Sequence, residues 1–171
     1  MLNPNDNMKK QESKKPKAVF AGSFDPFTIA HRYICEMAME LFDLTVLVCS
    51  NSHKTPMFTS DTRADFIRRT FTLRTGISVD VCTGLVSNYC KEHGIDYVVR
   101  GLRGHNCAEE FELASVYDEE GLETIMFPVC GAKYANVSST RVRDYIVFGG
   151  DWRPLVPEEM HGILESNLLP F

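Results

Sequence analysis

Residues 18–34 read AVFAGSFDPFTIAHRYI, and this stretch decides the fold of the chain. It passes from apolar, β-prone residues through a turn rich in Gly, Ser, Asp and Pro into a helical pattern. Thr28 can cap a helix that begins at Ile29, because its side-chain oxygen can accept early backbone N–H groups. The stretch therefore predicts a strand, a turn and a helix, with His31 in the first helical turn.

His31 at a helix start admits two interpretations. The start of a helix presents free N–H donors and the positive end of its dipole, and a histidine there can add a donor to a bound anion. Gly22 allows close approach of the backbone, and Pro26 stiffens the loop. The turn is then a phosphate-binding turn. In the other interpretation, His31 only hydrogen-bonds the nearby backbone.

The rest of the chain repeats the strand-and-helix pattern. Apolar, β-branched runs occur at 17–22, 44–50, 77–82, 96–100 and 123–128. Segments with helical spacing lie between and after them, at 29–42, 60–71, 85–94, 108–121 and 138–150, with a further short helix from about Pro157. This alternation predicts an α/β fold, a Rossmann-like doubly wound sheet of about five parallel strands with helices on both faces.

Composition narrows the function classes. The chain has 171 residues and a net charge of −5, so it lacks the overall basic balance of a nonspecific nucleic-acid binder. We expect a flexible polar tail at 1–15, a single domain at 16–171 and no membrane-spanning segment, since no apolar run is long enough. The six cysteines form no Cys-x-x-Cys pair, which fits a reducing cytoplasm better than zinc or disulfides.

Phosphate-type donors follow several of the predicted strands or open a predicted helix. In an open parallel sheet, ligands bind beyond the carboxyl ends of the strands, where these loops converge. In an acidic chain, such convergence indicates an anion site rather than solvated surface. These donors are Lys54, Arg100, Arg103, Ser138, Ser139 and Thr140.

Four segments, GSFDPFTIAH, HKTPMFT, VVRGLR and VSSTRVR, resemble the nucleotidyltransferase superfamily. Within it, the Arg-Gly-Leu-Arg and Lys-x-Pro-Met-Phe elements resemble the bacterial-type phosphopantetheine adenylyltransferases, over about residues 17–168. The resemblance implies transfer of AMP from ATP to 4′-phosphopantetheine, giving dephospho-CoA and pyrophosphate, with dephospho-CoA or CoA as product or inhibitor. It also implies Mg²⁺ held mainly by substrate phosphates, without protein metal ligands, and a homo-oligomer, in this family a hexamer.

The resemblance also assigns residues. It implies that His31, Lys54 and Arg100 are catalytic, with His31 at the transferring phosphate and the two cations clamping the acceptor phosphate and the polyphosphate. The acceptor would further contact the first turn and the stretch along the pantetheine arm, at Ser23, Phe24, Leu85, Val86 and Asn88. ATP would contact Ser23, Phe24, His31, Gly101, Arg103, Glu110, Ser138, Ser139 and Thr140.

The chain departs from the family pattern at several places. Ala30 replaces the glycine before the histidine, Ala114 stands where a glutamate is expected, and the loops 104–109 and 129–136 are longer. Two alternatives therefore stay open: a sister nucleotidyltransferase acting on another phosphorylated acceptor, such as nicotinate mononucleotide or glycerol phosphate, or a catalytically weak regulator that binds CoA or a nucleotide. Measured activity separates the enzyme from the regulator.

Overall fold

The computed structural model of the chain describes residues 15–50 and 55–168. The predicted tail at 1–15 lies outside these residues except for Lys15, and Lys54 lies outside them as well. The sequence predictions for the tail and for Lys54 therefore stay predictions.

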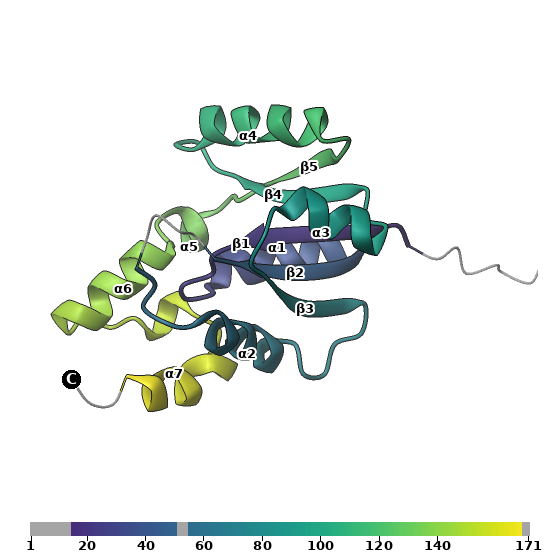
Figure 1. Cartoon of the computed structure of the whole chain (residues 1–171). Coiled ribbons are helices and arrows are strands. Elements are labelled where there is room, and N and C mark those ends of the chain that lie inside the picture. Colours follow the sequence, from purple (N-terminus) through teal and green to yellow (C-terminus); the bar gives the residue numbers. More distant parts are fainter. Residues whose placement is uncertain (1–14, 51–54, 169–171) are drawn as a thin grey trace, which may run out of the picture.

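One parallel sheet forms the centre of the fold (Figure 1). Its strand order is β3-β2-β1-β4-β5, and each neighbouring pair is parallel. The strands are β1 (Lys17–Gly22), β2 (Asp43–Cys49), β3 (Ile77–Cys82), β4 (Tyr97–Leu102) and β5 (Glu123–Pro128). All five predicted strands are confirmed to within two residues. Because β1 pairs with both β2 and β4, the strand order reverses at β1, and the loops after β1 and β4 diverge there to leave a crevice.

Helices cover both faces of the sheet, as predicted. In Figure 1, α3 (Val86–His93) lies in front of the sheet and α1 (Ile29–Met39) behind it. On the α1 side, alternate strand residues such as Phe20 and Val46 pack with α1 and with α2 (Ser60–Thr70). On the α3 side, Val19 and Leu47 pack with α3 and with α4 (Cys107–Glu119). The period of two along each strand thus divides the core into two layers.

The chain after β5 returns to the α1 side of the sheet. It forms α5 (Ala132–Ala135), α6 (Ser139–Phe148), the 3₁₀ turns η1 (Arg153–Leu155) and η2 (Glu158–Met160), and α7 (His161–Asn167). The helix expected near Pro157 is present as η2 and α7. The four-residue α5 was not expected from the sequence, and no side chain caps its start.

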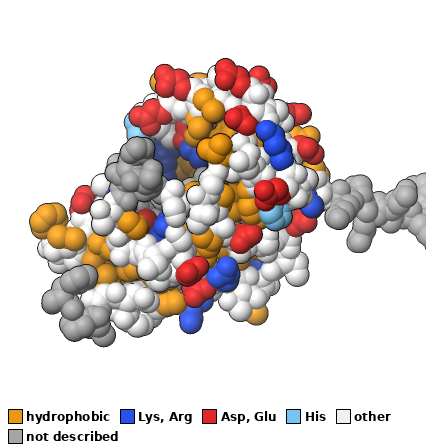
Figure 2. Space-filling view, in the orientation of Figure 1, with side chains coloured by type: hydrophobic (Ala, Val, Ile, Leu, Met, Phe, Trp, Pro, Cys, Tyr) orange, Lys and Arg blue, Asp and Glu red, His pale blue; other side chains and the backbone are white. Residues whose placement is uncertain are grey.

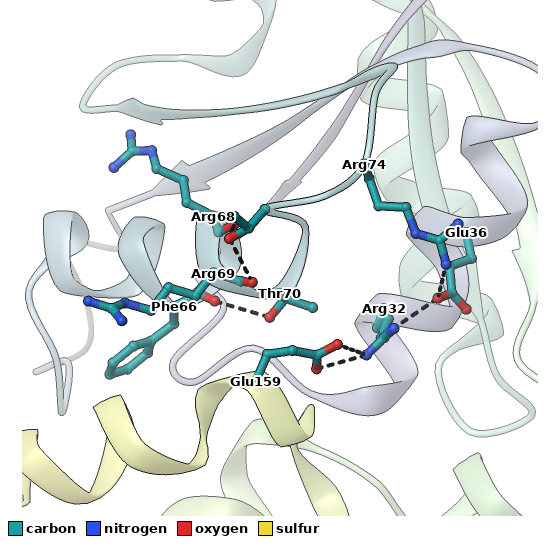
Figure 3. A network of polar contacts seen from close by, with 9 residues as sticks. Arg32, Glu36, Phe66, Arg68, Arg69, Thr70, Arg74 and Glu159 are labelled. Atoms are coloured by element: carbon teal, nitrogen blue, oxygen red, sulfur yellow. Dashed lines mark hydrogen bonds and ion pairs between the residues drawn. The ribbon is translucent and has the colours of Figure 1, made fainter.

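An ion-pair network fastens this C-terminal segment to α1 (Figure 3). Arg32 contacts both carboxylate oxygens of Glu159 at 2.9 Å and bonds Glu36 at 3.0 Å. Since Arg32 lies in the first turns of α1, η2 supports the start of that helix from outside.

In the described part of the chain, no helix combines the length and the apolar character that crossing a membrane requires.

Candidate active site

A reciprocal pair of hydrogen bonds holds the start of α1. The backbone N–H of His31 donates to Thr28 Oγ1 at 3.4 Å, and the backbone N–H of Thr28 donates to His31 Nδ1 at 3.1 Å. The predicted cap at Thr28 is confirmed. Because a backbone N–H can only donate, Nδ1 must carry a lone pair, and the proton of the neutral ring lies on Nε2. The ring bonds the backbone through one nitrogen, and among residues 15–50 and 55–168 its other nitrogen has no hydrogen-bond partner, so both interpretations of His31 are compatible.

The surroundings of His31 keep it neutral. Its ring lies among three phenylalanine rings, with centroids 5.1 Å from Phe24, 5.5 Å from Phe27 and 6.2 Å from Phe20. This burial, together with the positive charges of Arg103 and Arg100, lowers the pKa of His31 from 6.5 to about 3. At neutral pH, the site therefore contains a neutral hydrogen-bond donor instead of an imidazolium ion.

One cavity of about 210 Å³ brings most of the predicted residues together. It lies at the carboxyl ends of β1 and β4, at the crevice that the strand order creates. The predicted residues that line it are Ser23, Phe24, His31, Arg100, Gly101, Arg103, Glu110, Ser138 and Ser139. His105 and Asn106 line it too, although neither was among the predicted site residues.

A second cavity of about 260 Å³ adjoins the first. The two share Ser23 and Ser139 in their walls, and the predicted Thr140 lines the second. Ser138 caps α6 by accepting from the backbone N–H of Arg141 at 3.2 Å. Ser139 Oγ donates to the Pro26 carbonyl at 2.8 Å, which fixes the start of α6 against the turn after β1. The start of α6 therefore borders both cavities, which suits an anion that extends from one into the other.

A buried ion pair fixes Arg100. Its Nε and Nη2 donate to the two carboxylate oxygens of Glu110 at 2.6 and 3.0 Å, and its Nη1 donates to the Ala21 carbonyl at 3.0 Å. The side chains of Arg100 and Glu110 are 19% and 10% exposed. Asn106 also donates to Glu110, at 3.0 Å. Both oxygens of Glu110 are thus engaged, by Arg100 and Asn106, and its contact with ATP stays a prediction.

Arg103 and Gly101 are placed by backbone contacts. Arg103 donates from Nη1 to the Val137 carbonyl at 2.7 Å, which links the loop after β4 to the loop before α6. At Gly101, an added Cβ would lie 2.4 Å from Cδ1 of Ile34. A larger residue at this position would therefore displace the buried Ile34 side chain, which packs α1 against β4.

The turn after β1 has an unusual backbone. Phe24 has a φ of 48°, in the left-handed region that residues other than glycine rarely adopt. Its ring packs against Phe20 with centroids 5.2 Å apart, and a Cβ at Gly22 would lie 2.9 Å from its Cζ. The glycine and the strained phenylalanine thus depend on each other. Strain of this kind is concentrated at functional sites.

The residues predicted for the pantetheine arm are only partly brought to the site. Val86 lines a hollow of about 350 Å³ together with Ser23, Arg100 and Tyr117. Leu85 and Asn88 are exposed at the start of α3, and Leu85 is 64% exposed. Tyr117 was not predicted. Helical spacing was a signal for it. Tyr117 follows Glu110 by seven residues, which places both on the same face of α4, and these two are the buried residues of that helix.

The charge of the site contrasts with that of the whole chain. Acidic side chains gather over α4 (Figure 2), whereas Arg100 and Arg103 line the first cavity, and Arg63 and Arg143 the second. The carboxylates in these two walls are Glu110 and Asp25, and both already accept hydrogen bonds. Among residues 15–50 and 55–168, no group of three or more His, Cys, Asp or Glu side chains is placed to hold a metal ion. The site is built for anions.

Comparisons with known proteins agree with this geometry. A family model described as Cytidylyltransferase-like matches residues 19–145. The phosphopantetheine adenylyltransferase of Flavobacterium psychrophilum is 40% identical over 146 residues, covering 83% of this chain and 95% of the relative. The enzyme of the same name from Anaeromyxobacter dehalogenans is 38% identical over 155 residues, covering 88% and 94%.

Two solved structures share the fold. A bifunctional NMN adenylyltransferase/ADP ribose pyrophosphatase from Francisella tularensis, complexed with AMP and a manganese ion, aligns with a TM-score of 0.67 at 15% identity, covering 90% of this chain and 49% of the other. The Plasmodium falciparum nicotinic acid mononucleotide adenylyltransferase aligns with a TM-score of 0.60 at 15% identity, covering 90% and 96%. At this identity, the likeness establishes the Rossmann-like nucleotidyltransferase fold alone.

Proposed function

The chain belongs to the phosphopantetheine adenylyltransferase family, and we propose that it transfers AMP from ATP to 4′-phosphopantetheine, forming dephospho-CoA and pyrophosphate. One observation carries the proposal on the structural side. His31, Arg100, Arg103 and the serines at the start of α6 all line one cavity at the sheet crevice. The relatives' names favour this activity over a sister acceptor and over a regulator.

The chemistry needs positioning more than proton transfer. A phosphate oxygen of the acceptor forms a bond to the α-phosphorus of ATP while the bond to the bridging α–β oxygen breaks, and the electron pair leaves with pyrophosphate. The acceptor phosphate is already a nucleophile, so no general base is required. The protein holds two anions in line and supplies donors for the charge that grows on the transferring phosphate.

The residues divide this work. The Nε2–H of His31 donates to an oxygen of the transferring phosphate. Arg100, with Lys54, binds the acceptor phosphate, and Arg103 and Gly101 lie on the nucleotide side. Ser138, Ser139 and Thr140 at the start of α6 hold the β- and γ-phosphates, whose charge increases as the bond to the leaving group breaks. Ser23 and Phe24 form the turn where both substrates meet.

Magnesium fits this site when it arrives with the nucleotide. The carboxylates that line the two cavities, Glu110 and Asp25, are engaged by Arg100 and by backbone N–H groups. The ion would therefore take its oxygen ligands mainly from substrate phosphates and water, where it neutralises polyphosphate charge.

The setting of the enzyme is also part of the proposal. All six cysteines are free thiols, which fits the reducing cytoplasm. Exposed apolar side chains on α4, Phe111 at 58% and Val116 at 52%, fit burial against another copy in a homo-oligomer, in this family a hexamer. Dephospho-CoA and CoA would occupy the acceptor hollow beside Val86 as product or inhibitor.

The test is acceptor-dependent release of pyrophosphate. The full-length chain is incubated with ATP, Mg²⁺ and one of three acceptors, 4′-phosphopantetheine, nicotinate mononucleotide or glycerol phosphate, and the nucleotide product is identified by mass spectrometry. We expect pyrophosphate and dephospho-CoA with the first acceptor only. Release with another acceptor would favour a sister enzyme, and CoA binding without release from any acceptor would favour the regulator.

A further inference from the structure

Arg63 joins three backbone segments next to the site. Its side chain is 2% exposed and lies on α2. It donates to the Ser23 carbonyl in the turn after β1, to the Cys49 carbonyl at the end of β2 at 3.3 Å, and to the Phe58 carbonyl at 3.0 Å. Arg63 therefore holds the turn that carries Ser23, and the two residues line the second cavity together.

Asp25 makes the complementary contact from the same turn. Its Oδ2 accepts the backbone N–H of Met57 at 2.8 Å, and its Oδ1 accepts the backbone N–H of Phe58 at 3.1 Å. Its own carbonyl accepts Nη1 of Arg143 from α6 at 2.6 Å. One residue thus links the turn after β1 to the loop before α2 and to the helix whose start faces both cavities.

The carboxylate of Asp25 is buried, and no cation of the described residues forms an ion pair with it. It is 6% exposed, and none of the ion pairs among the described residues includes it. Two backbone donors and the nearby charge of Arg63 offset the cost of burying it. A carboxylate only accepts hydrogen bonds, so both of its oxygens can face N–H groups. An amide would turn a donor toward one of them.

The loop that Asp25 holds is a wall of the reaction site. Thr55 and Pro56, which directly precede Met57, line the second cavity with Ser23 and Ser139. Displacement of this loop would therefore change the width of the space into which the polyphosphate extends.

We propose that Asp25 is a positioning residue for adenylyl transfer, because its carboxylate fixes the loop at 55–58 against the turn at 23–26 and so sets the spacing of the walls between which the two phosphates react. The inference rests on the proposed function. Asp25 borders the second cavity, but both of its carboxylate oxygens already accept backbone N–H groups, so we assign it no direct bond to a substrate. It acts through the turn that carries Ser23 and through the loop.

Two variants of Asp25 test this role in the full-length chain. Asp25→Asn replaces one acceptor by a donor, and Asp25→Glu keeps the charge but displaces it by one methylene group. With ATP and 4′-phosphopantetheine, we expect Asp25→Asn to lower kcat by roughly 10²-fold, the scale of a 1 Å misplacement, with little change in either KM. Asp25→Glu should lower kcat less. Hydrogen exchange at the amides of Met57 and Phe58 should become faster in both variants.

A matched control separates positioning from stability. Thr70 is also 6% exposed, lies on α2 with Arg63, and donates to the Phe66 carbonyl at 3.0 Å (Figure 3). It is not among the described residues that line the two cavities. Thr70→Val should lower the Tm and leave kcat unchanged when the assay is run well below that Tm.

Three results would overturn the inference: wild-type kcat in folded Asp25→Asn, wild-type kcat in Asp25→Glu, or an equal loss of kcat in Thr70→Val. If Asp25→Asn does not fold, Asp25→Glu alone decides. A wild-type chain that is inactive with every acceptor would instead contradict the proposed function, which the acceptor panel detects before any variant is made.

Discussion

The turn after β1 and the loop after β4 face the same cavity, yet they are built in opposite ways. The β1 turn offers neutral donors, such as His31 Nε2–H, on a backbone fixed by buried contacts to α2 and α6. The end of β4 and the loop after it offer charge, in Arg100 and Arg103. Coulomb attraction falls slowly with distance, whereas a hydrogen bond is lost over a few tenths of an ångström and a few tens of degrees. The denser network of contacts is therefore found where placement matters most.

This difference predicts a division of kinetic effects. Changes on the β1 side should reduce kcat, because they misplace a donor for the transition state. Changes on the β4 side should raise KM, because they weaken the binding of an anion that is charged before and after reaction.

Replacement of His31 gives the largest expected effect. His31→Ala removes the Nε2–H donor, and we expect kcat to fall by roughly 10²-fold or more, as for the loss of one oxyanion-type donor. His31→Gln, which can place an amide N–H near the same point, should lose less. Steady-state kinetics and a melting curve measure both. Turnover close to wild type in folded His31→Ala would show that His31 has no catalytic role, and the proposed difference between the β1 side and the β4 side would then be wrong.

Replacement of Lys54 or Arg100, the two residues predicted to clamp the acceptor phosphate, is expected to weaken binding of the acceptor. For Lys54→Ala or Arg100→Ala, we expect weaker binding of 4′-phosphopantetheine in at least one variant, by roughly 10- to 100-fold for a lost charged hydrogen bond. Isothermal calorimetry measures this directly. If both variants bind the acceptor like wild type, the clamp assignment is wrong.

Arg100→Ala needs a control for stability. The variant leaves Glu110 buried without its cation, and breaking such a pair costs about 3–5 kcal/mol. Arg100→Ala/Glu110→Gln removes the stranded charge, so it should recover much of the free energy of unfolding without recovering acceptor affinity. Recovery of affinity in the double variant would show that Arg100 acts on binding only by supporting the fold.

The sequence predicts the two regions unequally well. Strands and the helix cap follow from local patterns, and the cap at Thr28 was confirmed because it needs only residues three apart. Asp25 bonds residues more than thirty positions away, and no periodicity in the sequence indicates such a contact. The positive φ of Phe24 could not be predicted from the sequence either. This backbone conformation depends on the packing of the Phe24 ring against Phe20 and on the space left by the missing Cβ of Gly22. Charges after strand ends could be listed from the sequence, but the pairing of Arg100 with Glu110 required the fold.

The neutrality of His31 gives a pH prediction. Its pKa is lowered to about 3 in the folded chain, against 6.5 when unperturbed, so the unfolded chain takes up this proton first as the pH falls. The contribution to stability is thus fully present above about pH 6.5 and decreases as the pH falls toward 3. His31→Gln should lose this part of the pH dependence, as measured by denaturation at several pH values.

Nitrogen NMR of the same ring provides a direct readout. The ¹⁵N signals of His31 should stay constant between pH 5 and 8, with Nδ1 unprotonated and the proton on Nε2. A signal that titrates in this range would show an imidazolium ion near the cavity. The β1 side would then act through charge as the β4 side does.

Ala30→Gly is the smallest and most discriminating change to the β1 side. Ala30 is fully buried in the first turn of α1, where alanine is favoured over glycine by roughly 1 kcal/mol, so we expect the Tm to fall by about 2–4 °C. Its side chain is not among the described residues that line the first cavity, so ATP affinity should be unchanged or slightly improved. A melting curve paired with an ATP titration, on wild type and variant, measures both quantities.

Loss of ATP binding would mean that the methyl group is a needed contact and that this turn differs from the family's glycine-containing form. Unchanged binding, with turnover of 4′-phosphopantetheine by the wild type, would show that the alanine adds helix stability without restricting the site, and Ala30 would no longer favour a regulator.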